Sequence, residues 1–496
     1  MRTIGHLIGG AEAADAAGRY APVWNPATGE QQARVALASA QEVRAAVGVA
    51  RAAAPGWRAT PLGRRAEVMF RFRDLLDAGR KEVARLLTAE HGKTLDDALG
   101  EIARGLENVE FACGAPHLLR GGYSEEVSAG VDVHEVRQPL GVVAGITPFN
   151  FPAMVPLWML ANALVCGNAF VLKPSERDPS PALFLAELLG RAGLPDGVLN
   201  VVQGDKVAVD ALLDHPDVAA VSFVGSTPIA RYVYERATAA GKRVQALGGA
   251  KNHMVVLPDA EIAAAADAAV SAAYGSAGER CMAVSVVVAV GEAADPLVEA
   301  IAARVRGIRV GPGYDAASEM GPLITAAHRD RVAAYLDTAT AQGASVVVDG
   351  RTDPATSGPG FFLGASLVDH VRPTSAVYTD EIFGPVLAVV RVATYDEALR
   401  LIEDNPYGNG AAIFTRDGGA ARRFTAEVQA GMVGVNVPIP VPVAYYSFGG
   451  WKGSLFGDLH MYGPDGIRFY TRTKVVTSRW PDPATSSVDL GFPRTR

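Results

Sequence analysis

The chain has 496 residues, of which 49% are hydrophobic and 20% are charged, and its formal net charge is −7. One hydrophobic core rarely serves a chain of this length, so two or more domains are expected. The negative charge argues against a nucleic-acid partner. The longest apolar stretch, residues 142–172, is interrupted by prolines and asparagines, which argues against a membrane span.

Cysteine is scarce in this sequence. Cys113, Cys166 and Cys281 are widely spaced and form no CxxC pair. This usage argues against a disulfide scaffold and a structural zinc site, and no metal is expected. It predicts a reducing compartment, which we take to be the cytoplasm.

Taken in chain order, apolar strands alternate with amphipathic helices, a pattern that predicts a mainly parallel sheet with helices on both faces. The first part of the chain is expected to be helical over residues 41–54, 63–92 and 95–114. A βα series follows, which is typical of nucleotide-binding domains. Its expected elements are strands 141–146, 169–173, 197–203 and 219–224, with helices 155–165 and 181–192.

A second α/β unit is expected to begin near Leu247. Its expected elements are strands 254–257 and 284–290 and helices 325–342 and 395–404. Residues 131–137 and 468–478 fit neither unit, because they look like strands of mixed polarity without a helix partner. Such strands often pair with each other or with a neighbouring subunit.

Cys281 is the candidate nucleophile. It lies in the turn Gly278-Glu279-Arg280-Cys281-Met282, between an alanine-rich helix and a strand, and a thiolate is the best protein nucleophile near neutral pH. A lone cysteine is more often a buried core residue, but the flanking charges favour the reactive role here. Cys113 and Cys166 lie in apolar helical stretches and are interpreted as core residues.

Attack of a thiolate on an aldehyde creates an oxyanion, which needs a hydrogen-bond donor. The loop of residues 147–152 offers the side-chain amide of Asn150, after the first strand of the βα series. Ligands of open α/β sheets bind at this edge. The alternative is that Asn150 caps a turn between two prolines.

No GxGxxG motif follows a strand, so two other strand ends are the candidates for binding a dinucleotide. Lys173 and Glu176 could hydrogen-bond adjacent ribose hydroxyls. Gly225 and Ser226 could present backbone donors at a helix N-terminus to a pyrophosphate. Each short motif also fits a plain turn, and only their order after successive strands makes them informative.

With these motifs in register, the chain resembles the aldehyde dehydrogenase superfamily. The ordered motifs are PFNFP (148–152), KPSE (173–176), FVGST (223–227), LGG (247–249), GERC (278–281) and EIFGP (381–385). The resemblance implies an α/β fold with a Rossmann-like cofactor domain, an α/β catalytic domain and a small β extension for oligomerisation. The corresponding boundaries are 1–122 with 142–246, then 247–440, and 123–141 with 466–490.

Within that superfamily the chain is most similar to the CoA-acylating branch that oxidises malonate and methylmalonate semialdehyde to acetyl-CoA or propionyl-CoA. The residues that carry this likeness are 151–159, 173–177, 249–253, the ERCMA run around Cys281 and 457–471. The resemblance implies that Cys281 is the nucleophile, Asn150 the oxyanion donor, coenzyme A the acyl acceptor and the assembly a homotetramer or homodimer. It also implies NAD contacts at Thr147, Phe149, Lys173, Glu176, Arg177, Ser226, Gly248 and Glu381.

The absence of a glutamate that could act as a general base is consistent with the CoA-acylating branch. Hydrolytic aldehyde dehydrogenases carry a glutamate before the LGG-type turn, as general base for water. Here the candidate positions are Ala246 and Leu247, and neither can accept a proton. Water should then attack the thioester slowly, and the thiol of coenzyme A should be the faster nucleophile. The alternative is that another residue, such as Glu279, serves as the base.

Two arginines are candidates for holding the substrate carboxylate, since a guanidinium fits a carboxylate in a bidentate manner. Arg280 adjoins the nucleophile, and Arg104 lies on the expected helix 95–114. For Arg104 the alternative is a solvated helix face with Asp97 or Glu101 as ion-pair partner. Residues 445–447 and Trp451 differ from the sequence that is usual in this branch.

Two alternatives to this function remain open. The first is a hydrolytic or CoA-acylating dehydrogenase of another aldehyde. The second is a catalytically silent binding or structural protein, against which the intact Cys281 and Asn150 argue.

Overall fold

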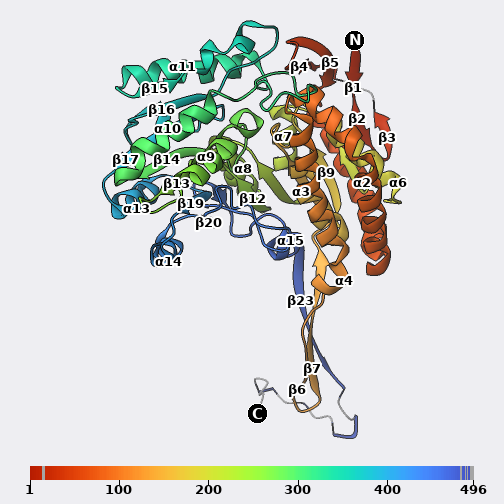
Figure 1. The fold of residues 1–496 in the computed structure, drawn as a ribbon. Coiled ribbons are helices and arrows are strands. Elements are labelled where there is room, and N and C mark those ends of the chain that lie inside the picture. Colours follow the sequence, from red (N-terminus) through yellow and green to blue (C-terminus); the bar gives the residue numbers. More distant parts are fainter. Residues whose placement is uncertain (14–16, 481–482, 486–487, 489, 492–496) are drawn as a thin grey trace.

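The computed structural model describes residues 1–13, 17–480, 483–485, 488 and 490–491. Small parts of the segments expected to form the cofactor domain (14–16) and the oligomerisation strands (481–482, 486–487 and 489) lie outside the described residues. Two large sheets covered by helices form the body, and a narrow sheet projects from it (Figure 1). Among the described helices, none has the length and apolarity needed to cross a membrane.

The first large sheet has the order β22-β12-β11-β8-β9-β10-β2-β3, and its five central strands are parallel. The bounds are β2 His6–Ile8, β3 Ala11–Ala13, β8 Val142–Ile146, β9 Ala169–Lys173, β10 Leu199–Val201, β11 Val218–Val224, β12 Arg243–Leu247 and β22 Leu455–Phe456. From β8 the chain proceeds outward through β9 and β10, then returns to the other side of β8 for β11 and β12. This is the strand order of dinucleotide-binding domains, and it confirms the expected Rossmann-like unit.

Alternating side chains of β8 explain why helices cover both faces of this sheet. Val143 packs into one apolar cluster, whereas Val142, Ala144 and Ile146 pack into another on the opposite face. The helices of this part of the chain are α1 Ala40–Ala59, α2 Leu62–His91, α3 Leu95–Cys113, α5 Met154–Val165, α6 Ser180–Arg191, α7 Lys206–Asp214 and α8 Thr227–Ala239. A strand buried on both faces has a continuous apolar sequence, and for this reason β8 could be predicted.

One expected strand is shorter in the structure. Residues 197–203 were expected to form a strand, but β10 spans only Leu199–Val201. Gly197 has a φ of +80°, in the left-handed region that a β-strand cannot use. The strand therefore begins only after this turn.

The junction between α2 and α3 is sharply defined. Gly92 ends α2 with a φ of +96°, a conformation that favours glycine. Thr94 then caps α3, because its hydroxyl accepts a hydrogen bond from the backbone N–H of Asp97. Lys93 is the one residue between the two caps, Gly92 and Thr94. It is buried, with 1% of its surface exposed.

The second large sheet has the order β15-β16-β17-β14-β13-β19-β20. Its strands are β13 Asn252–Val256, β14 Val284–Val290, β15 Ser345–Val348, β16 Ser366–Asp369, β17 Val386–Val392, β19 Gly410–Phe414 and β20 Met432–Val435. The accompanying helices are α9 Ile262–Tyr274, α10 Ala294–Val305, α11 Ala326–Ala341, α12 Ala376–Thr379, α13 Tyr395–Asp404 and α14 Gly418–Glu427. Apart from β15 the strands are parallel, and their valine-rich sequences are typical of strands buried on both faces.

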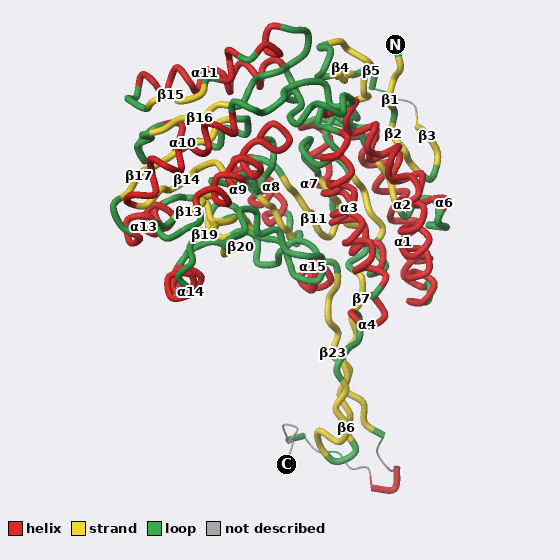
Figure 2. Tube along the Cα trace, in the orientation of Figure 1, coloured by secondary structure: helices red, strands yellow, loops and turns green. Residues whose placement is uncertain are grey.

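The projecting sheet is built from β6 (Tyr123–Ser128), β7 (Val131–Pro139) and β23 (Thr471–Arg479). β23 pairs with β7 in antiparallel fashion along its whole length, from Thr471 opposite Pro139 to Arg479 opposite Val131. Figure 2 shows these strands leaving the body as a ribbon. Of the two pairings left open by the sequence, with each other or with a neighbouring subunit, the structure shows the first, but the expected start at residue 468 is wrong. Residues 468–469 are the end of a short helix, α15 (Gly463–Phe469).

Smaller elements complete the described chain. They are β1 Arg2–Ile4, β4 Tyr20–Asn25, β5 Glu30–Ala36, α4 Ala115–Leu118, β18 Tyr407–Gly408 and β21 Trp451–Lys452. β22 and β12 pair in antiparallel fashion, so the segment after the second sheet returns to extend the first.

Candidate active site

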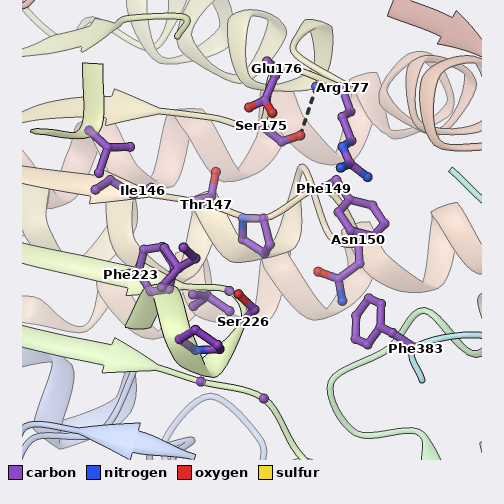
Figure 3. Close-up of a pocket in the computed structure, with 18 of the residues that line it drawn as sticks. Ile146, Thr147, Phe149, Asn150, Ser175, Glu176, Arg177, Phe223, Ser226 and Phe383 are labelled. Carbon is purple, nitrogen blue, oxygen red and sulfur yellow. Dashed lines mark hydrogen bonds between the residues drawn. The ribbon is translucent and has the colours of Figure 1, made fainter. Parts of the chain in front are cut away.

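A cleft of about 1100 Å³ opens at the carboxyl ends of β8, β9 and β11, lined from both large sheets. β8 and β11 are the strands between which the order of the first sheet reverses, the usual ligand position in open α/β sheets. Ten of the twelve predicted site residues line it, some of which Figure 3 shows: Thr147, Phe149, Asn150, Lys173, Glu176, Arg177, Ser226, Gly248, Cys281 and Glu381. Arg104 and Arg280 do not line it.

One wall of the cleft fits an anionic group. α8 begins at this wall, and its N-cap Ser226 has an extended backbone and a side chain that caps no backbone N–H. The free N–H groups of a first helical turn attract negative charge. The expectation that Gly225 supplies such a donor is wrong, because its N–H donates to the carbonyl of Leu247 at 3.1 Å, and Pro228 in the first turn has no N–H. The side chains of Lys173, Arg177 and Arg331 line the same cleft. This set of donors and cations suits the pyrophosphate of a dinucleotide.

Lys173 and Glu176 form an ion pair at the end of β9, with 3.2 Å between Nζ and Oε2. Burial opposes ionisation of Glu176, but the ammonium of Lys173 and a backbone hydrogen bond outweigh it and lower the pKa of the carboxyl. Glu176 is therefore a carboxylate near neutral pH. A carboxylate beside a lysine suits paired hydroxyls such as those of a ribose.

Aromatic rings close another part of the cleft. The guanidinium of Arg177 lies over the ring of Phe149, 5.2 Å from its centroid, and Phe149 contacts Phe383 edge to face at 5.9 Å (Figure 3). Phe383 belongs to the EIFGP motif but was not singled out from the sequence. Its position in the cleft depends on how the second sheet packs against the first, which the local sequence does not show.

A constrained turn presents Cys281. The residues before it include Ser276, Ala277 and Gly278, all with φ between +52° and +74°. A Cβ on Gly278 would lie 2.3 Å from the carbonyl oxygen of Gly384, so this position accepts only glycine. The backbone carbonyl of Cys281 accepts a hydrogen bond of 3.1 Å from the side chain of Asn409. The nucleophile is thus held through its main chain, while its thiol remains at the cleft.

The surroundings of Cys281 favour the protonated thiol. Burial raises the pKa of Cys281 to about 12, and the nearby Glu381 adds to the rise. Backbone N–H groups and Arg280 oppose this shift without overcoming it. Burial also raises the pKa of Glu381 to about 7, although a hydrogen bond from the backbone of Ala250 lowers it. A thiolate at Cys281 therefore forms only when another group accepts the thiol proton.

Asn150 offers a free donor in the same cleft. Its residue surface is only 4% exposed, and no hydrogen bond to another described residue occupies its side-chain amide. Although the residue as a whole is mostly buried, its amide is not enclosed and is open to the cleft. Its chemistry matches an oxyanion that forms only during reaction.

No carboxyl side chain stands at the positions where a hydrolytic base is expected. Ala246 and Leu247 are both buried in β12. Glu279, the alternative base, points away into a buried cluster, where His91 lies 3.7 Å and His328 3.4 Å from its carboxylate oxygens. Burial raises the pKa of Glu279 to about 8. It is not among the residues that line the cleft.

The two arginines are engaged in ion pairs. Arg280 pairs with Asp97, and Arg104 pairs with Glu107 at 3.0 Å on the surface of α3. The partners anticipated for Arg104, Asp97 and Glu101, are wrong, because Asp97 binds Arg280 and Glu101 binds the buried Lys93. Arg280 does line a small cavity that Cys281 also lines. It is therefore close to the nucleophile, although not in the large cleft.

The fold and the cleft together define the class. A first sheet with five parallel central strands, a second α/β unit that carries a cysteine in a constrained turn, and a projecting β extension form the aldehyde dehydrogenase architecture. The model of the aldehyde dehydrogenase family matches residues 13–476. The chain belongs to this family.

Several known proteins of this family are similar to the chain over nearly its whole length. A malonate-semialdehyde dehydrogenase of Pseudomonas aeruginosa is 58% identical over 99% of this chain and 100% of its own length. A crystal structure of methylmalonate-semialdehyde dehydrogenase from Oceanimonas doudoroffii is 57% identical, with a TM-score of 0.96 over 98% of this chain and 99% of that chain. A Sinorhizobium meliloti protein assigned to the same group, crystallised with NAD, is 55% identical, also with a TM-score of 0.96 over 98% and 99%.

Proposed function

We propose that this chain is an NAD-dependent, CoA-acylating dehydrogenase of malonate and methylmalonate semialdehyde, which yields acetyl-CoA or propionyl-CoA with loss of the carboxyl group. The observation that carries the proposal is that Cys281 and the unpaired amide of Asn150 line one cleft with an anion-binding wall. Relatives that are 58% and 57% identical bear names with these substrates.

In the proposed reaction, the thiolate of Cys281 attacks the aldehyde carbon, and the amide of Asn150 donates a hydrogen bond to the oxyanion that forms. When bound, NAD supplies the hydride acceptor that turns this adduct into a thioester. The thioester then loses its carboxylate as carbon dioxide, and the electron pair left on the carbon next to the thioester carbonyl takes up a proton. The thiol of coenzyme A displaces the resulting acetyl or propionyl group and leaves its proton on Cys281, which is thereby regenerated. The apolar Ala246 and Leu247 leave water without a base at this position.

The cleft residues divide into two proposed roles. Binding of NAD is assigned to Thr147, Phe149, Lys173, Glu176, Arg177, Ser226, Gly248 and Glu381, which all line the cleft. Binding of the substrate carboxylate is assigned to Arg280 and Arg104. For Arg280 this requires the guanidinium to exchange Asp97, its partner in the structure, for the substrate.

A second candidate is a dehydrogenase of another aldehyde. It is favoured by the ion pairs of Arg104 and Arg280, because both guanidinium groups already have a carboxylate partner and neither lines the large cleft. A substrate without a carboxylate would leave both pairs intact.

The experiment that tests the proposal measures NADH formation from malonate semialdehyde, methylmalonate semialdehyde and propionaldehyde, each with and without coenzyme A. The products are identified by mass spectrometry. The proposal expects CoA-dependent turnover of the semialdehydes, with acetyl-CoA and propionyl-CoA as products. Free acids, or a preference for propionaldehyde, would support the second candidate.

Assembly and location belong to the same proposal. Among the described strands, β6 and β23 are the two outer strands of the projecting sheet, which suits pairing with a second copy of the chain in a homotetramer or homodimer. Light scattering coupled to gel filtration measures the mass. The three free cysteines, two of them buried, are consistent with action in the reducing cytoplasm.

A further inference from the structure

A buried ion pair lies directly behind the loop that carries Asn150. Nζ of Lys93 is 2.6 Å from Oε2 of Glu101, and both side chains are fully buried. Lys93 stands between α2 and α3, and Glu101 lies on α3. A buried ion pair is weak evidence for stability, because desolvating two charges costs about as much as their attraction returns. Its location therefore calls for a reason other than stability.

Lys93 binds the main chain of the oxyanion donor itself. Its Nζ donates a hydrogen bond of 2.7 Å to the backbone carbonyl of Asn150. The same ammonium lies 4.6 Å from the ring centroid of Phe151, the next residue of the loop. One lysine thus contacts two consecutive residues of the loop from the side opposite the cleft.

Glu101 holds the other end of the same loop. Its Oε1 accepts hydrogen bonds from the backbone N–H groups of Ala153 and Met154, at 2.8 and 3.0 Å. These groups begin α5, whose N-cap residue Ala153 has no side chain that can cap them. A carboxylate at a helix N-terminus is favourable, and here it comes from another helix. The loop is fixed at both ends by the two partners of one ion pair.

From this geometry we infer that Lys93 and Glu101 are positioning residues, which set the direction of the Asn150 amide toward the oxyanion formed at Cys281. The inference rests on the proposed role of Asn150. The reason for a charged pair is directional: the ammonium binds a carbonyl while the carboxylate binds N–H groups, so the loop cannot shift along either contact. A misplacement of about 1 Å at a reacting group can reduce the rate on the order of 10²-fold.

The test is a double-mutant cycle on the rate of the first NADH burst, with coenzyme A withheld. The variants are Lys93→Met/Glu101→Gln, Asn150→Ala and the combination of all three substitutions. The Met/Gln pair keeps the side-chain volumes, leaves no unpaired buried charge and preserves an amide oxygen for the start of α5. Asn150→Ala is expected to slow the burst roughly 10²–10³-fold. The paired variant is expected to slow it at least about 10-fold.

The decisive result is non-additivity. If Lys93 and Glu101 act through Asn150, adding their substitutions to Asn150→Ala should slow the burst less than about 3-fold further. The NAD dissociation constant should be unchanged in the paired variant. Lys242→Met is the matched control. It removes another buried lysine, which donates to the carbonyl of Val218 at the far end of β11, and its burst rate should remain that of the wild type.

Several outcomes overturn the inference. The inference is wrong if the paired variant has a normal burst rate while Asn150→Ala has a slow one. It is also wrong if the reductions in burst rate are fully additive when the substitutions are combined. A normal burst in Asn150→Ala would instead reject the proposed role of Asn150 itself. If the paired variant does not fold, Lys93→Arg keeps the charge for Glu101 but moves the donor from the carbonyl of Asn150. It should slow the burst only when Asn150 is present, and a wild-type burst rate overturns the inference.

Discussion

The side-chain amide of Asn252 donates a hydrogen bond of 2.9 Å to the backbone carbonyl of Cys281, 29 residues further along the chain. The same amide group donates to the carbonyl of Ala283, and its oxygen accepts from the backbone N–H of Gly410. Asn252 therefore ties the nucleophile turn to two strands of the second sheet. Because this contact uses only the main chain of Cys281, the sulfur atom can be changed without loosening the turn.

Replacing Cys281 with Ser or Ala should abolish NADH formation and leave NAD binding and folding nearly unchanged. The physical reason is that the thiol makes the covalent bond, whereas the turn is held by Asn252 and Asn409. Cys113→Ala is the control, since Cys113 is buried away from the cleft. Near-wild-type turnover of the Cys281 variants in a stopped-flow assay would falsify the mechanism.

NAD should be used with higher kcat/KM than NADP. Glu176 is ionised beside Lys173, and a carboxylate near the ribose hydroxyls repels a 2′-phosphate. The guanidinium of Arg177, which lies over Phe149, is the group that could offset this repulsion. Glu176→Ala should narrow the preference, and Glu187→Ala on the surface of α6 should not. Equal efficiency of the wild type with both cofactors would contradict this prediction.

Arg280 and Arg104 should matter more for semialdehydes that carry a carboxylate than for propionaldehyde. Losing the charged partner of a substrate carboxylate costs about 2–5 kcal/mol. Truncation to Ala should therefore raise the KM for methylmalonate semialdehyde strongly and that for propionaldehyde little. Arg309→Ala, which removes an exposed arginine paired with Glu319, serves as the control. Equal losses on both substrates would assign the two arginines to the structure alone.

Withholding coenzyme A should produce a burst of about one NADH per active subunit, followed by a slow steady phase. The reason is that neither Ala246 nor Leu247 can activate water, so the thioester accumulates. Addition of coenzyme A should restore turnover and give a thioester product. Fast steady turnover without it, with a free acid as product, would place this protein among the hydrolytic enzymes.

Glu279 should make the protein less stable as the pH rises from about 5 to 8. Burial raises its pKa in the folded state from an ordinary value of 4.5 to about 8, so the folded protein holds a proton that the unfolded chain releases. Its stabilising contribution is complete below pH 4.5 and is lost as the pH passes through 8. Glu279→Gln should therefore lose less thermal stability between pH 5 and 8 than the wild type or the exposed control Glu82→Gln. Parallel pH profiles of Tm would rule out this linkage.

The sequence by itself determined the elements that depend on local patterns. Strands such as β9 and β14 were predicted with their final bounds, because a strand buried on both faces is a continuous apolar run. Asn150 and the KPSE and FVGST residues could be proposed as site residues because their motifs follow strands whose carboxyl ends open into the cleft, whereas Cys281 was proposed from its turn between a helix and a strand. The chemistry expected of a cysteine thiol and an asparagine amide follows from the residue types themselves.

Only the tertiary structure decided which charges meet. Asp97 and Arg280 are 183 residues apart, and nothing in the local sequence distinguishes their pair from the helix-surface pair anticipated for Arg104. Lys93 and Asn150 are likewise 57 residues apart. From the sequence alone, a lysine between two helices is expected to be exposed to solvent, and only the packing of the helices buries it. The physical reason is the range of the forces. Backbone hydrogen bonding and periodic burial act over a few residues, whereas the partner of a buried charge is chosen by how whole elements pack.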